Sequence, residues 1–88
     1  MLTQREKESL VEKFKIHASD TGSIEVQAAI LTEEIRQLLL HLKEHAKDVH
    51  SKRGLLKMVA KRRTLISYLK REDEKRHASL IKKLGLKH

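Results

Sequence analysis

The chain has 88 residues, a formal net charge of +8 and no cysteine. This length suits one domain of residues 1–88 with a modest core, and the lack of cysteine excludes a scaffold held by disulfides. The sequence contains neither an apolar run long enough to cross a bilayer nor a signal-peptide pattern at its start, so we expect a cytoplasmic protein that does not enter a membrane.

The composition favours an all-α fold. Proline is absent, glycine occurs three times, and the aromatic residues are limited to Phe14 and Tyr68. Strands prefer aromatic and β-branched residues, whereas this chain is rich in Leu, Lys, Glu, Arg and Ala, which favour helices. We predict a three-helix bundle core with a shorter additional N-terminal helix, four helices in all.

Capping signals and apolar spacing predict the first two helices. Thr3 and Glu6 form a capping box before the apolar residues Leu10, Val11 and Phe14. The polar segment from Ile16 to Ser23 predicts a loop. Ser23 then caps a second helix, in which Glu25 suits the positive end of the helix dipole. Its apolar seam comprises Ile24, Ala28, Leu31, Ile35, Leu38 and Leu42.

Two further helices are predicted in the C-terminal half. A polar stretch over residues 46–53 precedes a third helix, whose apolar face comprises Leu55, Met58, Val59, Leu65, Ile66 and Leu69. Arg62 falls within that face by angle, so we expect its charged head to reach solvent or an acid. Asp73 caps a short fourth helix, which Gly85 ends. The apolar residues of this helix are Ala78, Leu80, Ile81 and Leu84.

The basic excess lies almost entirely in the C-terminal part of the chain. The net charge is 0 over residues 1–23, −2 over residues 24–49 and +10 over residues 50–88. This asymmetry indicates a polyanionic partner. A solvated basic surface that only keeps the protein soluble is the alternative.

One face of the third helix combines basic residues with an aromatic ring. At about 100° per residue, Tyr68 falls on this face, which we call the basic track. The track comprises Arg53, Lys57, Lys61, Thr64, Tyr68 and Arg71. The Tyr68 ring there can stack on a base or pack on a ribose of RNA. The alternative is that Tyr68 covers the junction with the fourth helix.

Two other functional patterns have weaker support. His41 to His45 matches the H-x-x-E-H pattern of some zinc proteases, but only His50 is near enough to add a ligand and a small bundle offers no cleft. We therefore expect no metal, no cofactor and no enzymatic activity. A helix-turn-helix needs a turn of three or four residues, and we expect a longer connection between the second and third helices. A sequence-tolerant DNA-binding protein of the nucleoid remains the alternative function.

Six short segments form a recognisable pattern along the chain. They are residues 19–23, 25–27, 50–56, 61–63, 68–71 and 83–86. In order and spacing they resemble bacterial small-subunit ribosomal protein fifteen, over nearly all 88 residues. The resemblance implies a four-helix structural protein of the small ribosomal subunit. It also implies that the protein is a primary binder of the central domain of small-subunit ribosomal RNA, early in assembly.

The resemblance implies two RNA-binding surfaces. One grips a three-way junction and maps onto Thr21, Gly22, Gln27 and Tyr68. The other lies on the shallow minor groove of an adjoining RNA helix and maps onto His41, Asp48 and Ser51. We expect Arg53, Lys57, Lys61 and Arg71 of the basic track to contact phosphates.

The resemblance also implies further partners. They are other ribosomal proteins of the small subunit, large-subunit ribosomal RNA at an intersubunit bridge and, in some bacteria, the protein's own messenger RNA. We expect the free protein to be a monomer.

The chemistry of the mapped residues suits these roles. Gly22 lets backbone approach closely, and Gln27 can donate and accept at a base edge or a 2′-hydroxyl. Asp48 can accept from a guanine amino group in the minor groove. Helix capping is the alternative role for Asp48 and Ser51.

The chain departs from the family at several positions. Ile24, Glu34, Val49 and His77 stand where the family often has Pro, Arg, His and Tyr. Because a carboxylate cannot replace an arginine at a junction, we assign no RNA contact to Glu34.

Overall fold

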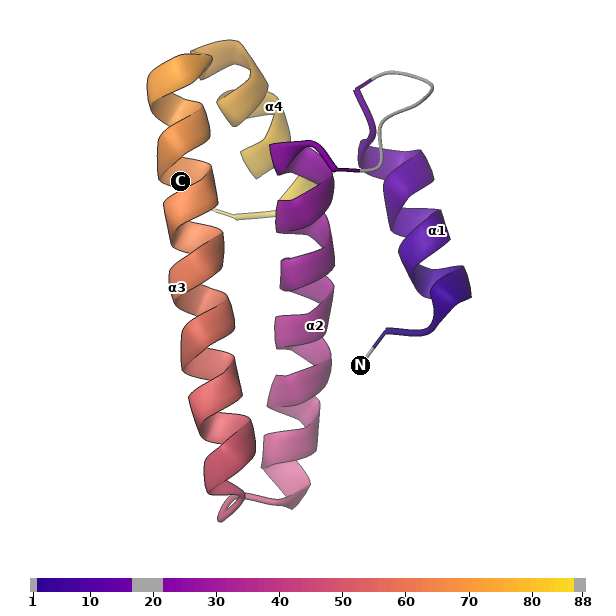
Figure 1. Cartoon of the computed structure of the whole chain (residues 1–88), viewed down its shortest axis with the longest axis vertical. Helices are drawn as coiled ribbons and strands as arrows, with labels where there is room; N and C mark the ends of the chain where they lie inside the picture. The colour runs from indigo at the N-terminus through magenta and orange to yellow at the C-terminus, as the bar shows by residue number, and fades with distance from the viewer. Residues whose placement is uncertain (1, 17–21, 87–88) are drawn as a thin grey trace.

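A computed structural model describes residues 2–16 and 22–86, which form four helices and no strand (Figure 1). The helices are α1 (Gln4–Phe14), α2 (Ile24–Glu44), α3 (Val49–Glu72) and α4 (Glu74–Leu84). The all-α prediction is confirmed. In the described part of the chain, no helix is both long enough and apolar enough to cross a membrane.

The helix boundaries follow the predicted capping residues. Thr3 and Glu6 exchange both bonds of the capping box, each of 3.1 Å. The Ser23 hydroxyl accepts from the Val26 backbone at 3.2 Å, and the Asp73 carboxylate accepts from the Arg76 backbone at 3.1 Å. Gly85 ends α4 with a φ of 72°, the left-handed conformation that favours glycine. These local signals therefore placed both ends of α4 and the starts of α1 and α2.

The start of α3 differs from the prediction. The helix begins at Val49, inside the stretch that the sequence analysis treated as a polar connection, and only residues 45–48 separate it from α2. The first turn of α3 is mostly exposed, so no apolar periodicity marks it. The expectation of a longer connection was wrong. α2 and α3 nevertheless do not form a helix-turn-helix, because they run side by side as an αα-hairpin (Figure 1).

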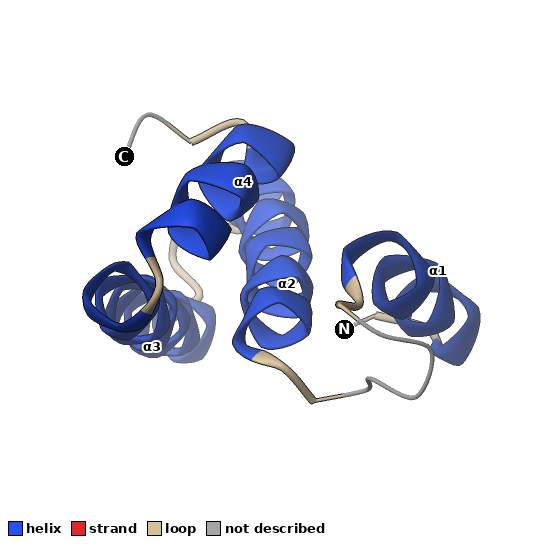
Figure 2. Cartoon of the chain, turned by 90° about the horizontal axis from the view of Figure 1, so that it is seen from above, coloured by secondary structure: helices blue, strands red, loops and turns tan. Residues whose placement is uncertain are grey.

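The α2–α3 hairpin carries a short helix on each side. α4 packs against both α3 and α2, whereas α1 contacts α2 (Figure 2). α1 and α4 have 11 residues each, against 21 for α2 and 24 for α3. The predicted three-helix core with an added N-terminal helix is thus confirmed, with an α4 as short as α1.

The core lies where the four helices meet. It comprises Phe14, Val26, Ala28, Ala29, Ile66, Leu69, Leu80 and Ile81. The predicted seam of α2 is buried at Ala28, Leu31 and Ile35, but Val26 and Ala29 are buried as well. Because α1 lies on one side of α2 and the other helices on the opposite side, α2 buries more than one stripe. Ala78, predicted to be apolar core of α4, is exposed.

Arg62 was expected to reach solvent or an acid, but its described partner is a hydroxyl. It is half-buried, and its Nη1 donates to the Thr32 hydroxyl of α2 at 3.3 Å. That hydroxyl donates in turn to the Ala28 carbonyl at 2.8 Å. The arginine is therefore accommodated in the apolar face of α3 through a polar side chain of the neighbouring helix.

An ion pair between a buried carboxylate and a half-buried arginine joins α4 to the first turn of α2. Glu25 is 6% exposed, and the Arg76 guanidinium donates to its two carboxylate oxygens at 2.6 and 2.5 Å. A bidentate arginine satisfies a carboxylate that burial removes from water. The pair thus fixes the start of α2 against α4.

Replacing Arg76 with alanine should leave the Glu25 carboxylate buried without its guanidinium. We expect Arg76→Ala to lower the free energy of unfolding by about 3 kcal/mol, measured by urea denaturation. Lys82→Ala, an exposed change on the same helix, should change it by less than about 0.5 kcal/mol.

A second variant separates the pair from other effects of the substitution. Glu25→Gln combined with Arg76→Ala should recover part of the loss, since a neutral amide costs less to bury than a carboxylate. Equal stability of Arg76→Ala and Lys82→Ala would contradict the role of the pair.

Candidate nucleic-acid interface

A compact polar cluster joins the end of α2 to the start of α3. His41, Asp48 and Ser51 form it, and we call it the hairpin cluster. Asp48 Oδ2 lies 2.9 Å from His41 Nε2 and accepts from the Ser51 hydroxyl at 2.7 Å. Asp48 Oδ1 accepts from the Ser51 backbone at 3.0 Å and so caps α3. The capping alternative for Asp48 is therefore observed, and the same carboxylate also holds two side chains.

The environment of Asp48 favours its charged form. Hydrogen bonds from the Ser51 hydroxyl, from His41 and from the Ser51 backbone hold the pKa of this carboxyl well below its usual range. The carboxylate consequently stays ionised and keeps both neighbours oriented at neutral pH.

These bonds determine which groups of the hairpin cluster remain for a ligand. The Ser51 hydroxyl donates its single hydrogen to Asp48, and its lone pairs can still accept a hydrogen bond. His41 uses Nε2 on Asp48, which leaves Nδ1. Asp48 Oδ1 accepts the bond from the Ser51 backbone and has a second lone pair. The cluster can therefore present both imidazole and oxygen groups in a fixed arrangement.

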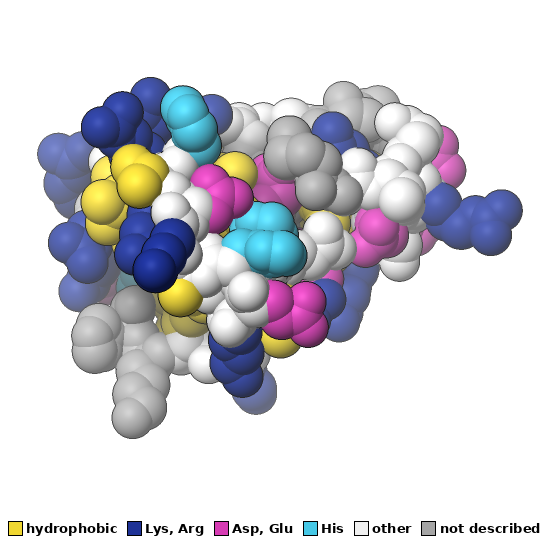
Figure 3. Space-filling model, turned by 90° about the horizontal axis from the view of Figure 1, so that it is seen from below, with side chains coloured by type: hydrophobic (Ala, Val, Ile, Leu, Met, Phe, Trp, Pro, Cys, Tyr) yellow, Lys and Arg dark blue, Asp and Glu magenta, His cyan; other side chains and the backbone are white. Residues whose placement is uncertain are grey.

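The hairpin cluster borders a shallow hollow of about 270 Å³. The hollow is lined by Glu34, Gln37, Leu38, His41, Ser51 and Met58. The His41 and His45 rings lie 4.6 Å apart, tilted by 31°. Seen from the end that carries the α2–α3 turn, histidine and acidic side chains lie side by side, with lysine and arginine towards the edges (Figure 3).

The opposite end of the hairpin carries the residues mapped to a junction. Gln27 Nε2 donates to the Gly22 carbonyl at 2.7 Å. A Cβ added at Gly22 would meet no atom within 4 Å among the described residues beyond its chain neighbours. The packing of the protein therefore does not require a glycine there, and the space beside it is open. Thr21 lies outside the described residues.

Tyr68 lies on the exposed basic track of α3. Tyr68 is 45% exposed, so much of its side chain is open to solvent. The Arg71 guanidinium lies 6.0 Å from the centroid of the Tyr68 ring. Arg53, Lys57 and Lys61 are exposed on the same face. The structure thus brings a ring and four cations to one side of α3, as the periodicity predicted.

The predicted site residues fall into two groups along the hairpin. Gly22 and Gln27 lie near the start of α2, and His41, Asp48 and Ser51 lie around its end. Gln27 and His41 are 14 positions apart, or about 21 Å along a helix. Because α3 runs back along α2, Tyr68 and Arg71 lie towards the same end as Gly22 (Figure 1). No hydrogen bond joins the two groups among the bonds described.

Sequence reasoning missed one polar contact beside these groups. Gln37 Nε2 donates to Glu6 Oε2 at 2.8 Å and ties α1 to α2 next to the hollow. Glu34 lines the same hollow. Gln27, Glu34 and His41 follow one another at intervals of seven residues along this flank of α2, but the partner of Gln37 comes from α1 and could not be found from α2 alone. In residues 2–16 and 22–86, no group of three or more potential ligands is placed to hold a metal ion.

Comparison with known proteins identifies the family. The family model for ribosomal protein S15 matches residues 7–87. The chain belongs to this family. Proteins of the ribosomal protein S15 family are structural components of the ribosome without enzymatic activity, which confirms the prediction that the chain is not an enzyme.

Individual relatives agree over nearly the whole chain. The sequence is 57% identical over 86 residues to the small ribosomal subunit protein uS15 of Carboxydothermus hydrogenoformans. The matched region covers 98% of this chain and 97% of that protein. Proteins of the same name from Oceanobacillus iheyensis and Anoxybacillus flavithermus are 56% and 57% identical over the same coverage. The similarity to these proteins thus extends over nearly the whole chain.

The hairpin cluster should make stability depend on pH. Because the folded chain lowers the pKa of Asp48, the unfolded chain binds this proton more readily. The stabilising contribution is complete above the ordinary Asp pKa of about 3.9 and is lost as the pH falls below it. Asp48→Asn should therefore flatten the fall of the urea midpoint between about pH 5 and pH 2.

Glu44→Gln is the matched control for this measurement, because it removes an exposed carboxyl of α2 outside the cluster. Parallel pH profiles for the original chain and Asp48→Asn would rule out the stabilising role of the carboxylate.

Proposed function

We propose that the chain binds small-subunit ribosomal RNA through two surfaces at opposite ends of the α2–α3 hairpin. Membership in the ribosomal protein S15 family makes it a protein of the small subunit, located in the cytoplasm as part of the ribosome. The observation that carries the proposal is the hairpin cluster, in which one carboxylate orients an imidazole and a hydroxyl at an exposed helix turn. The whole chain acts as one RNA-binding domain.

The hairpin cluster suits the minor groove of an RNA helix. This groove is wide and shallow and displays 2′-hydroxyls and base edges. Ser51 can accept from a 2′-hydroxyl or a guanine amino group, and His41 Nδ1 can pair with a second 2′-hydroxyl. Asp48 acts mainly by orienting these two, with the second lone pair of Oδ1 as a further acceptor. A surface built of acceptors gains little from phosphates, so it selects a site rather than supplying general affinity.

The other end of the hairpin suits a junction of RNA helices. The open space beside Gly22 admits a ribose or phosphate to the backbone, and Gln27 retains its amide oxygen for a base edge. The exposed ring of Tyr68 can stack on an unpaired base. Thr21 completes this surface in the proposal with a hydroxyl for phosphate or ribose.

The basic track supplies affinity between the two ends. Arg53, Lys57, Lys61 and Arg71 are exposed along one side of α3, where they can neutralise backbone phosphates. Binding both a junction and an adjoining helix would fix their relative direction. An early role in subunit assembly follows, because later partners would meet RNA that is already oriented.

Three further roles belong to the same proposal through the family resemblance. They are contact with other proteins of the small subunit, contact with large-subunit RNA at a bridge, and repression of the protein's own messenger RNA. A free protein that is monomeric would suit binding to one RNA site.

Binding to a three-way junction tests the proposal directly. A junction RNA from the central domain should bind at least tenfold more tightly than a plain RNA duplex of equal length in moderate salt, by filter binding. Tyr68→Ala should weaken junction binding about tenfold, and Tyr68→Phe should retain most of it because the ring remains. Equal affinity for junction and duplex would refute specific binding, and preference for duplex DNA in competition would favour the nucleoid alternative.

The basic track makes a separate prediction about salt. Lys57→Ala should reduce the slope of log K against log salt by about one, because one phosphate contact is lost. Tyr68→Ala should leave that slope nearly unchanged, since the ring carries no charge. An unaltered slope for Lys57→Ala would remove this residue from the phosphate contacts.

A further inference from the structure

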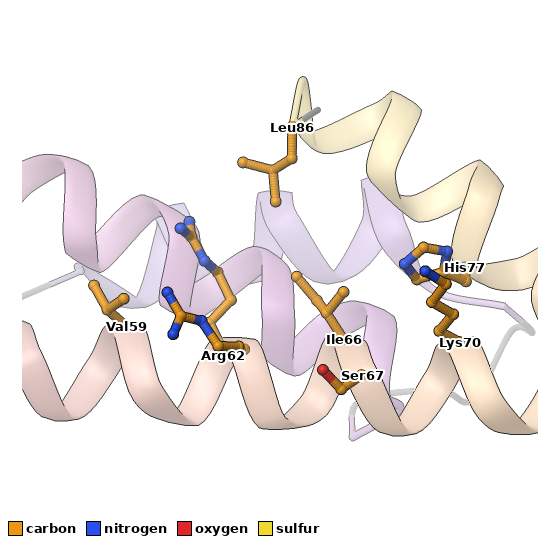
Figure 4. Close-up of a pocket in the computed structure, with 8 residues that line it drawn as sticks. Val59, Arg62, Ile66, Ser67, Lys70, His77 and Leu86 are labelled. Atoms are coloured by element: carbon orange, nitrogen blue, oxygen red, sulfur yellow. The ribbon is translucent and has the colours of Figure 1, made fainter. Parts of the chain in front are cut away.

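A second basic surface lies between α3, α4 and the segment that follows α4. It surrounds a hollow of about 510 Å³, which we call the basic hollow. Its polar side chains are Arg62, Arg63, Ser67 and Lys70 from α3 and His77 from α4. Figure 4 shows Arg62, Lys70 and His77 around the space between the two helices. Neither the mapped RNA residues nor the basic track includes any of these side chains.

The charge of the basic hollow is unbalanced. Two arginines, one lysine and one histidine line it, and none of its described lining residues carries a carboxylate. By contrast, the hollow beside the hairpin cluster includes Glu34, and a third hollow near Phe14 includes Glu25. Cations gathered in one concavity repel one another and attract an anion. The basic hollow therefore suits a negatively charged group.

The basic hollow also has an apolar side. Val59 and Ile66 of α3 and Leu86 line it, and Leu86 points towards α3 from the opposite side (Figure 4). Ile66 and Leu86 also belong to or pack on the core, so this apolar side is firmly supported. Its volume falls within the range of roughly 300–1,000 Å³ typical of small-molecule sites. A ligand with both an anionic and a flat apolar part would use both sides.

The direction of the basic hollow separates it from the basic track. At about 100° per residue, Ser67, Arg63 and Lys70 point roughly 80°, 120° and 140° away from the middle of the track around α3. A nucleic-acid helix lying along the track would therefore face away from Arg63 and Lys70. A ligand that contacts both of these cations is a different segment or a different molecule.

We propose that the basic hollow binds one unpaired nucleotide of an RNA strand. The phosphate would lie on the exposed cations Arg63 and Lys70, with the Ser67 hydroxyl and the His77 imidazole as hydrogen-bonding groups. The base would lie against Ile66 and Leu86. Arg62, already bonded to Thr32, would add positive charge from the inner wall. This site is independent of the two RNA surfaces proposed above.

Titrations with matched ligands test this assignment. The chain would be titrated with a single-stranded RNA hexamer of mixed sequence, with adenosine monophosphate and with ribose 5-phosphate, and followed by NMR. We expect the hexamer to shift the signals of Ser67, His77 and Leu86 first. Adenosine monophosphate should bind at least threefold more tightly than ribose 5-phosphate, because only the former has a base.

Two variants with equal changes in charge locate the binding. Lys70→Glu should weaken hexamer binding at least fivefold, whereas Arg5→Glu, on the exposed side of α1, should change it less than twofold. Leu86→Ala should weaken the binding of adenosine monophosphate but not the binding of ribose 5-phosphate. Junction-RNA binding by Lys70→Glu should match that of Arg5→Glu, which keeps this test separate from the junction test.

Several results would overturn the proposal. Equal losses of hexamer binding in Lys70→Glu and Arg5→Glu would show a general charge effect. Equal affinity for adenosine monophosphate and ribose 5-phosphate would remove the base from the site. If the chain binds adenosine monophosphate but does not bind the hexamer, the hollow is a site for a free nucleotide and not for an RNA strand.

Discussion

The pairing of Glu25 with Arg76 constrains the whole molecule. The carboxylate lies in the first turn of α2, where the helix dipole favours it, yet it is buried and needs a cation. Arg76 supplies that cation from α4, 51 positions later in the chain. The bond thereby holds α4 across the end of the hairpin that also carries Gly22 and Gln27. The proposed junction surface and the wall of the basic hollow formed by α4 both depend on this placement.

Much of the local structure could be predicted from the sequence, because capping and periodicity act over a few residues. Thr3, Ser23, Asp73 and Gly85 mark helix ends as expected. The start of α3 was missed because its cap, Asp48, precedes an exposed turn without apolar spacing. The polar contacts of Arg62 and Glu25 were missed because their partners come from helices distant in the chain.

The candidate sites divide in the same way. Helical angles alone placed Tyr68 on the exposed basic track, and the family resemblance singled out His41, Asp48 and Ser51. The basic hollow could not be found by angles around α3, because α4 and Leu86 form its other walls. The charge distribution was only a partial guide. The C-terminal part of the chain carries the basic excess, whereas an imidazole, a carboxylate and a hydroxyl form the hairpin cluster.

The αα-hairpin also fixes the distance between the two proposed surfaces. Gln27 and His41 lie on one continuous helix, so the distance between the two proposed surfaces is set by a count of residues and cannot be adjusted by a loop. One residue inserted in α2 would turn one surface by about 100° relative to the other. A whole added turn would restore the direction but lengthen the span by about 5.4 Å, and α3 would need the same turn to stay in register. The length of this hairpin should therefore resist change even where its surface residues vary.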